Sequence, residues 1–219
     1  MTTQEYLQSR LDSLRDLTAS DSLANTSDEE LYKRTHSKLM SKKYRKLKAT
    51  EACEEVVERA IKRAISNKSP ITVSVLFGGN KLWRFEEAPE IDWAELFSLF
   101  YYIDWLKSVA SVYPYGARLD YYSQDVSIES LNNVPRSETD NYSQTFRDML
   151  SWIKPYLPQN IEVTYRRHFE EFENPDDYYK ELELGKKTVL DRNNGELPTL
   201  TDAMKTATEL NVKLKPDQD

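Results

Sequence analysis

Residues 71–81 read ITVSVLFGGNK, and this apolar run followed by a pair of glycines decides the fold of the chain. The β-branched, nearly uncharged residues Ile71–Phe77 favour a strand, and their pattern predicts a central strand covered on both faces. A long apolar helix is expected over residues 92–113, and a second strand over residues 118–122. The order of strand, helix and strand predicts a βαβ unit with parallel strands.

The elements outside this unit extend the same pattern. Apolar residues recur at helical spacing over residues 50–67 and again from Ser137, and a third strand is expected over Ile161–Tyr165. The sequence therefore predicts an α/β fold in which helices flank a parallel sheet. The expected divisions are an N-terminal helical and basic extension at 1–49, an α/β core domain at 50–172, and an irregular acidic extension at 173–219.

The composition limits the classes of protein to which the chain can belong. Its 219 residues carry 37 acidic and 30 basic side chains, which give a formal net charge of -7. No apolar run of about 18 residues is present, so no transmembrane helix is expected, and the polar start resembles no secretory signal. The single Cys53 cannot form an internal disulfide, and its place on an apolar helical stripe predicts a small core residue. These features predict a cytoplasmic protein.

The content of glycine, histidine and cysteine argues against several common sites. The five glycines form neither of the usual nucleotide-binding fingerprints, G-x-G-x-x-G and G-x-x-x-x-G-K-[ST]. Two histidines and one cysteine argue against a zinc site of ordinary ligands. No metal and no cofactor are therefore expected.

Polar residues follow the first strand, at a point where α/β sheets bind ligands. They are Gly78, Gly79, Asn80 and Lys81. The two glycines allow a tight turn whose N–H groups can cradle an anion, and the lysine adds a charge suited to phosphate or carboxylate. The alternative is an ordinary turn with a surface lysine.

Further polar residues follow the second and third strands. Ser123 and Asp125 follow the second strand, where a carboxylate can act as a base, bind a substrate amine or cap a helix. The third strand runs into Arg166, Arg167 and His168. Paired arginines bind anions and an imidazole titrates near neutral pH, so this trio is either a site or a solvent-exposed strand end. Strand alternation places Arg166 and His168 on one face and Arg167 on the other.

The N-terminal part of the chain contains a short helix and a basic segment. Residues 1–27 predict a weak helix in an arm that is mobile or packed against a partner, and Ser27 followed by acidic residues marks a helix start. Every charged residue from Lys33 to Lys48 is basic. This segment is either a weak contact for nucleic acid or an acidic partner, or a solvated helix face that balances acidic segments elsewhere.

Short motifs between Ile71 and Phe169 resemble those of a known enzyme family. They are an apolar strand ending in a glycine and lysine turn, P-x-x-D-x-x-E, Tyr-Pro-x-Gly, a Ser-x-Asp strand end and a Tyr-x-x-x-Phe helix. The matching residues are Pro89, Asp92 and Glu95, then Tyr113, Pro114 and Gly116, then Ser123 and Asp125, and finally Tyr142 and Phe146. This combination resembles the isocyanide synthases and the related dityrosine-biosynthesis enzymes of fungal spore walls.

The resemblance implies a Rossmann-like fold and a biosynthetic enzyme of secondary metabolism. Enzymes of this family convert the amino group of tyrosine or tryptophan to an isonitrile, with a pentose phosphate as the carbon donor and without a metal. By this likeness, Lys81 holds the phosphate or attacks the sugar carbonyl, and Asp125 meets the polar end of the amino acid. His168 is the third catalytic candidate, and the alternative is an interaction module that has lost catalysis. The substrate-binding candidates are Gly78, Gly79, Asn80, Ser123, Arg166 and Arg167.

Overall fold

The computed structural model describes residues 2–15, 26–44, 51–77, 90–123 and 134–192. The chain divides into two compact units, each built from three separate stretches. The first unit comprises Met1–Val75, Ile91–Tyr121 and Thr145–Tyr165, and the second comprises Leu76–Glu90, Tyr122–Gln144 and Arg166–Asp219.

Helices and strands alternate along the described residues. The N-terminal elements are α1 (Thr3–Arg15), α2 (Asp28–Leu39), the 3-10 helix η2 (Lys42–Tyr44) and α3 (Glu51–Asn67). The central elements are β1 (Ile71–Phe77), α4 (Trp93–Ala110), β2 (Ala117–Ser123) and α6 (Arg136–Ile153). The C-terminal elements are η3 (Lys154–Tyr156), β3 (Ile161–Arg167), η4 (His168–Glu171) and α7 (Pro175–Arg192).

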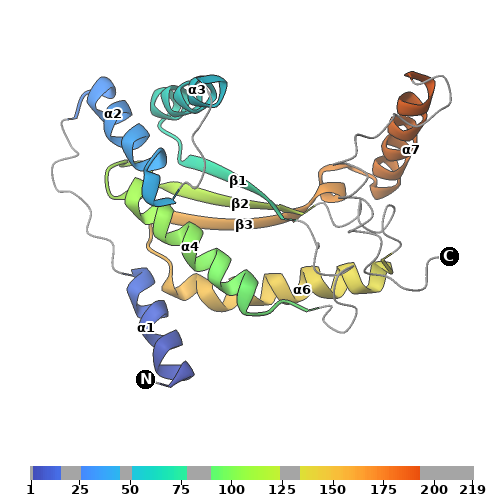
Figure 1. Ribbon diagram of the computed structural model, residues 1–219, viewed down its shortest axis with the longest axis horizontal. Helices are drawn as coiled ribbons and strands as arrows, with labels where there is room; N and C mark the ends of the chain where they lie inside the picture. The colour runs from blue at the N-terminus through green and yellow to red at the C-terminus, as the bar shows by residue number, and fades with distance from the viewer. Residues whose placement is uncertain (1, 16–25, 45–50, 78–89, 124–133, 193–219) are drawn as a thin grey trace, which may run out of the picture. The chain divides into compact units, whose positions relative to one another are not determined.

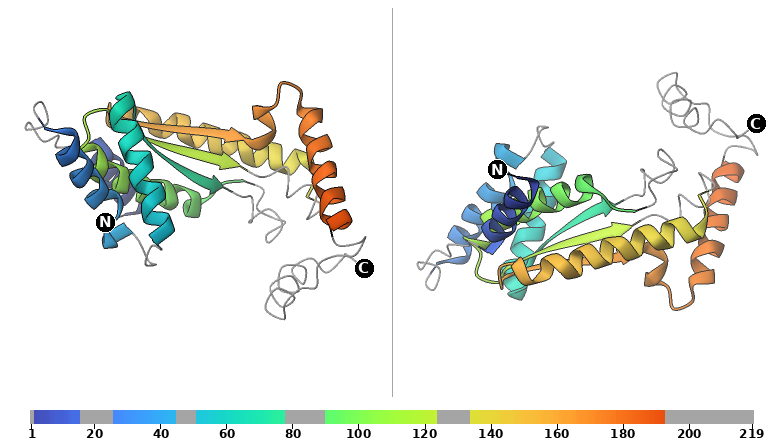
Figure 2. Two further views of the ribbon diagram at one scale, coloured as in Figure 1. Left: turned by 90° about the horizontal axis from the view of Figure 1, so that it is seen from above. Right: turned by 90° about the horizontal axis from the view of Figure 1, so that it is seen from below.

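The three strands form one sheet in the order β1-β2-β3. Their arrows point the same way in the left-hand view of Figure 2, so the sheet is parallel. Helices join consecutive strands and flank the sheet, because parallel neighbours need a long crossover connection. The predicted α/β fold is confirmed, and its arrangement is Rossmann-like.

β1 lies at an edge of the sheet, so the prediction of a central strand covered on both faces is wrong. Ile71 is buried, but Thr72, Ser74 and Leu76 are exposed, and Leu76 is 70% exposed. Thr72 and Ser74 carry no charge, but their hydroxyl groups allow them to face water on an open side of a sheet. A run without charges therefore predicted the strand correctly and its burial incorrectly.

In the first unit, α4 and the C-terminal half of α6 cover one face of the sheet (Figure 1). Leu99, Ile103 and Leu106 of α4 are fully buried. The ring of Tyr121 in β2 meets the ring of Phe146 in α6 edge to face, with centroids 5.1 Å apart. Burying each such side chain contributes about 1.5–3 kcal/mol, so this layer is the main support of the first unit.

The N-terminal helix α1 belongs to this core. Leu11 and Leu14 are buried, and Arg10 pairs with Asp104 of α4 at 2.8 Å. The Lys107 ammonium also donates a hydrogen bond to the Ser13 carbonyl oxygen. Within the arm that was expected to be mobile or packed against a partner, Thr3–Arg15 is therefore a helix that packs on its own chain.

The sequence predicted the start of helix α2 correctly but not its end. The Ser27 hydroxyl accepts a hydrogen bond from the Glu30 backbone N–H at 3.3 Å, which confirms the predicted helix start. The helix ends at Leu39, so the basic segment Lys33–Lys48 does not form one continuous helix. Residues 45–48 of that segment lie outside the described residues.

Helix α4 has a capping box at its N-terminus. The Asp92 backbone N–H donates to a Glu95 carboxylate oxygen at 2.7 Å, and the Asp92 carboxylate accepts from the Ala94 N–H at 2.7 Å. Both acidic groups thus satisfy backbone donors that a helix leaves unpaired. Their role is structural.

Burial in α3 is confined to its C-terminal half. Cys53 is exposed, so the prediction of a core cysteine is wrong. Ile61 is buried two turns further along, where the helix meets the rest of the first unit. Glu58 pairs with Lys62 at 2.6 Å on the solvated side of the helix.

The region after residue 173 also differs from the prediction. It was expected to be irregular, but Pro175–Arg192 forms α7. The Asn174 side-chain oxygen accepts a hydrogen bond from the Asp176 N–H at 3.1 Å, and Pro175 fits the first helical position. Across the described ranges, no helix has both the length and the apolar character needed to cross a membrane.

Tyr113 makes the folded state sensitive to alkaline pH. Its ring is fully buried, and its hydroxyl donates a hydrogen bond to the Ser69 carbonyl oxygen at 2.8 Å. Burial, with a smaller contribution from Tyr115, raises the pKa of Tyr113 to about 12. Because unfolded tyrosine titrates at about 10, the stabilisation is complete below about pH 10 and is lost as the pH rises toward 12.

Replacing Tyr113 with phenylalanine removes this ionisation and keeps the ring. We expect Tyr113→Phe to lower the free energy of unfolding by about 1 kcal/mol at neutral pH, because a buried hydrogen bond is lost. At about pH 11 the difference between the two proteins should shrink, since the variant has one tyrosine fewer to ionise on unfolding. Urea unfolding at both pH values measures this. If both proteins lost the same free energy of unfolding between neutral pH and about pH 11, Tyr113 would not be the source of the alkaline sensitivity.

Candidate functional site

The structure describes four of the predicted site residues. Gly78, Gly79, Asn80, Lys81 and Asp125 lie outside the described residues. Ser123, Arg166, Arg167 and His168 are described, and all four belong to the second unit.

Arg166 and His168 lie against the same aromatic ring. The Arg166 guanidinium is 5.0 Å from the centroid of the Tyr122 ring, and the His168 ring centroid is 5.2 Å from it. Arg166 also pairs with Glu171. Burial, and next the nearby Glu171 carboxylate, raise the pKa of the Tyr122 hydroxyl, which favours its neutral, hydrogen-donating form. Two strand ends thus bring a cation, an imidazole and a phenol together.

Arg167 points to the opposite side, as strand alternation predicts. It is buried, and its guanidinium pairs with Asp140 and donates to the Thr139 hydroxyl at 3.2 Å. Its backbone N–H donates to a Glu170 carboxylate oxygen at 2.9 Å. A buried arginine with these partners fixes the end of β3 to α6.

Ser123 has no exposed surface. It occupies the last position of β2. A ligand at the strand ends would not touch its side chain unless the backbone moved. Of the four described candidates, Arg166 and His168 are therefore the ones placed to meet a small molecule.

Arg136 is a residue that the sequence analysis missed. It lies at the start of α6, where its guanidinium is 5.3 Å from the centroid of the Phe169 ring and donates to the Tyr179 hydroxyl at 2.9 Å. The ring of Tyr178 lies 4.9 Å from that of His168. The adjacent tyrosines were visible in the sequence, but no local pattern linked Arg136 to residues more than 30 positions away.

These residues make up the strand-end cluster. Its members are Tyr122, Arg136, Asp140, Arg166, Arg167, His168, Phe169, Glu171, Tyr178 and Tyr179. Three guanidinium groups stand among aromatic rings, and the side chains of Arg136 and Arg166 are each 48% exposed. The exposed guanidinium groups of Arg136 and Arg166 can exchange a carboxylate partner for an anionic ligand. Among the described residues, no group of three or more metal-ligating side chains occurs.

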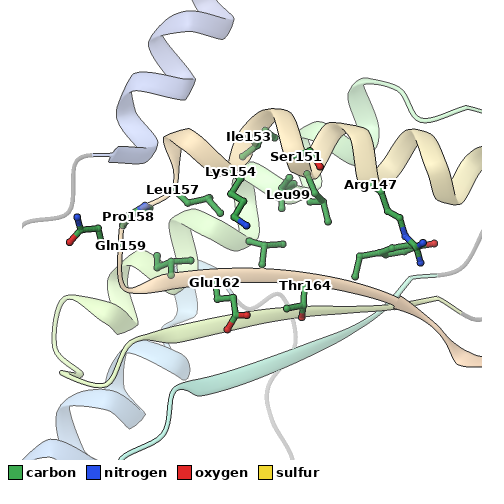
Figure 3. Close-up of a pocket in the computed structure, with 14 residues that line it drawn as sticks. Leu99, Arg147, Ser151, Ile153, Lys154, Leu157, Pro158, Gln159, Glu162 and Thr164 are labelled. Atoms are coloured by element: carbon green, nitrogen blue, oxygen red, sulfur yellow. The ribbon is translucent and has the colours of Figure 1, made fainter. Parts of the chain in front are cut away.

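A separate groove lies in the first unit, between β3 and the C-terminal half of α6 (Figure 3). Its volume is about 830 Å³, and Leu99 forms part of its apolar wall. Arg147 and Lys154 point from the helical side toward β3, and Glu162 lies on the strand (Figure 3). Glu162 pairs with Arg118 at 2.7 Å. The described lining contains neither histidine nor cysteine, so the strand-end cluster is the stronger candidate for proton-transfer chemistry.

The basic segment at the N-terminus is partly neutralised. Lys33 pairs with Glu29 at 3.2 Å, and Arg34 pairs with Glu30 at 2.8 Å. Both pairs span one helical turn on the surface of α2. These contacts favour the interpretation of a solvated helix face over that of a nucleic-acid contact.

No family model, no curated protein and no solved structure matches this chain. The likeness of its short motifs to isocyanide synthases therefore stays a prediction. The geometry of the strand-end cluster carries the functional argument.

Proposed function

We propose that the chain is a small-molecule enzyme that binds an anionic substrate at the strand-end cluster. One observation carries this proposal: the side chains of Arg166 and His168 share the ring of Tyr122 where two neighbouring parallel strands end. Ligands of α/β sheets bind outside the carboxyl ends of the strands. A guanidinium there suits a phosphate or carboxylate, because its fork of donors matches two anionic oxygens.

His168 supplies the proposed acid–base group. An imidazole is the side chain that most often serves as a general acid or base in enzymes. Its ring is held between those of Tyr122 and Tyr178, with centroid distances of 5.2 Å and 4.9 Å. A ring held on two sides keeps its nitrogens in a fixed direction, which proton transfer to a bound substrate requires.

The motif resemblance supplies the proposed substrates. These are tyrosine or tryptophan and a pentose phosphate, with the phosphate on Arg166 and the aromatic ring beside the tyrosines of the cluster. On the same basis, Lys81 is proposed to engage the sugar and Asp125 the amino acid. The pentose phosphate supplies the isonitrile carbon, and the bonds between that carbon and the rest of the sugar break as its bonds to the amino nitrogen form.

Turnover tests this proposal directly. The full chain is incubated with tyrosine and ribulose 5-phosphate, and the isonitrile stretching band is followed by infrared spectroscopy. We expect the band to appear with the wild-type protein and to form about 100-fold or more slowly with His168→Phe, which keeps an aromatic ring but cannot transfer a proton. No band from the wild-type protein would refute the isonitrile reaction, and an unchanged rate in His168→Phe would refute the role of His168.

A further inference from the structure

The outer edge of β1 has unused hydrogen-bonding groups. The Ile71 backbone N–H donates to the Gly116 carbonyl oxygen of the β2 side at 3.1 Å. In a parallel ladder, alternate residues direct their backbone groups to the same neighbour. Thr72 and Ser74 therefore direct their N–H and C=O groups away from β2. No strand pairs with this edge in the described part of the chain.

A groove runs beside this edge, and we name it the β1 edge groove. It lies in the first unit between β1 and α3 and has a volume of about 650 Å³. The wall formed by α3 presents Val56, Val57 and Ala60. Val56 is 55% exposed, so this wall presents an apolar side chain that no described residue covers. An apolar helix wall beside an open strand edge is the arrangement that accepts an added strand.

Two polar side chains give the groove its specificity. Trp105 lines the groove, and its indole Nε1–H is buried with no hydrogen-bond partner among the described residues. An unsatisfied buried donor is costly, and a carbonyl oxygen from a ligand would satisfy it once the side chains that cover this nitrogen move aside. Arg63 is the one charged residue in the described lining. The groove therefore favours an occupant that combines apolar groups with a carboxylate.

We propose that the β1 edge groove binds an extended segment of a partner protein, which adds to the sheet beside β1. Its backbone bonds to Thr72 and Ser74, its alternate apolar side chains enter the groove along α3, and an acidic side chain meets Arg63. Four or five residues span the open edge, since a strand rises about 3.3 Å per residue. A second copy of this chain fits less well, because residues 69–75 read SPITVSV and offer no carboxylate to Arg63.

The first test selects and then modifies a peptide. Eight-residue peptides displayed on phage are selected on the full-length protein, and we expect sequences with alternate apolar residues and one Asp or Glu. A selected peptide is then methylated at single backbone nitrogens and measured by fluorescence polarisation. Methylation on the edge that faces β1 should weaken binding tenfold or more, and methylation one residue further along should leave it unchanged. Failure to select any peptide, or equal effects at both positions, would overturn the proposal.

Protein variants provide the second test. Ser74→Pro removes an N–H that the sheet does not use, so it is expected to fold and to bind the peptide tenfold or more weakly. Ser74→Ala is the matched control, because it keeps the N–H and should bind normally. Arg63→Glu and Trp105→Phe should weaken binding, the latter about three- to tenfold. Normal binding by Ser74→Pro, or a wild-type dimer in sedimentation that Ser74→Pro dissociates, would overturn the proposal.

Discussion

Gly116→Ala is expected to destabilise the protein by about 3 kcal/mol. Gly116 has a φ of +79°, a conformation that favours glycine. A Cβ at this position would lie 2.5 Å from the carbonyl oxygen of Asn160. That carbonyl is backbone, so it cannot swing aside as a side chain would.

The position also sets the register of all three strands. The Gly116 carbonyl oxygen accepts from the Ile71 N–H at 3.1 Å, and the Ala117 N–H donates to the Asn160 carbonyl oxygen at 2.9 Å. Moving the turn to relieve the clash would therefore strain the starts of β1 and β3 together. The glycine of the Tyr-Pro-x-Gly motif is therefore explained by the geometry of this turn.

Gly185→Ala is the matched control for this prediction. Gly185 lies within α7, and a Cβ there would meet nothing within 4 Å. Alanine should be neutral or stabilising by up to about 1 kcal/mol, because it is the better helix former. Urea denaturation of both variants gives the two free energies. A Gly116→Ala protein as stable as the Gly185→Ala protein would show that the turn is not constrained as described.

Arg166→Glu is expected to weaken the binding of ribulose 5-phosphate by about 10- to 100-fold, since a charge-assisted hydrogen bond to phosphate contributes about 1.5–3 kcal/mol. The substitution replaces an attractive charge by a repulsive one beside the Tyr122 ring. Stability should change by less than about 1 kcal/mol, because the pair of Arg166 with Glu171 is on the surface. Isothermal titration calorimetry measures the dissociation constant.

Arg118→Glu separates a local effect from a general effect of charge. Arg118 is also a strand arginine paired with a glutamate, at 2.7 Å from Glu162, and its side chain is 41% exposed against 48% for Arg166. It belongs to the first unit, outside the strand-end cluster. The two variants change the net charge equally, so any difference in binding between them is local. Because Arg118 is not part of the proposed site, binding of ribulose 5-phosphate should be normal in Arg118→Glu. Equal weakening in both variants would mean that the anion is not bound at Arg166.

Local sequence signals predicted the elements and their caps well. Ser27 caps a helix as expected, because a cap depends on residues within one turn. Strand alternation correctly separated Arg166 from Arg167, because the period of a strand is local as well. Pro175 followed by two acidic residues was a usable signal for α7 that the acidic composition concealed.

Features that depend on distant parts of the chain were not predictable in this way. The edge position of β1 follows from strand order, which no property of Ile71–Phe77 encodes. The burial of Leu14 depends on the packing of α1 against α4. The contribution of Arg136 to the strand-end cluster depends on aromatic residues from η4 and α7. Each case requires tertiary contacts that single-sequence patterns do not contain.

A crystal structure of the protein soaked with phosphate tests the central claim most directly. The account predicts an anion within about 3 Å of the Arg166 guanidinium, beside His168 and Tyr122, with Glu171 displaced from its pair with Arg166. Phosphate found only elsewhere on the protein, with the pair of Arg166 and Glu171 intact, would contradict the proposed substrate site.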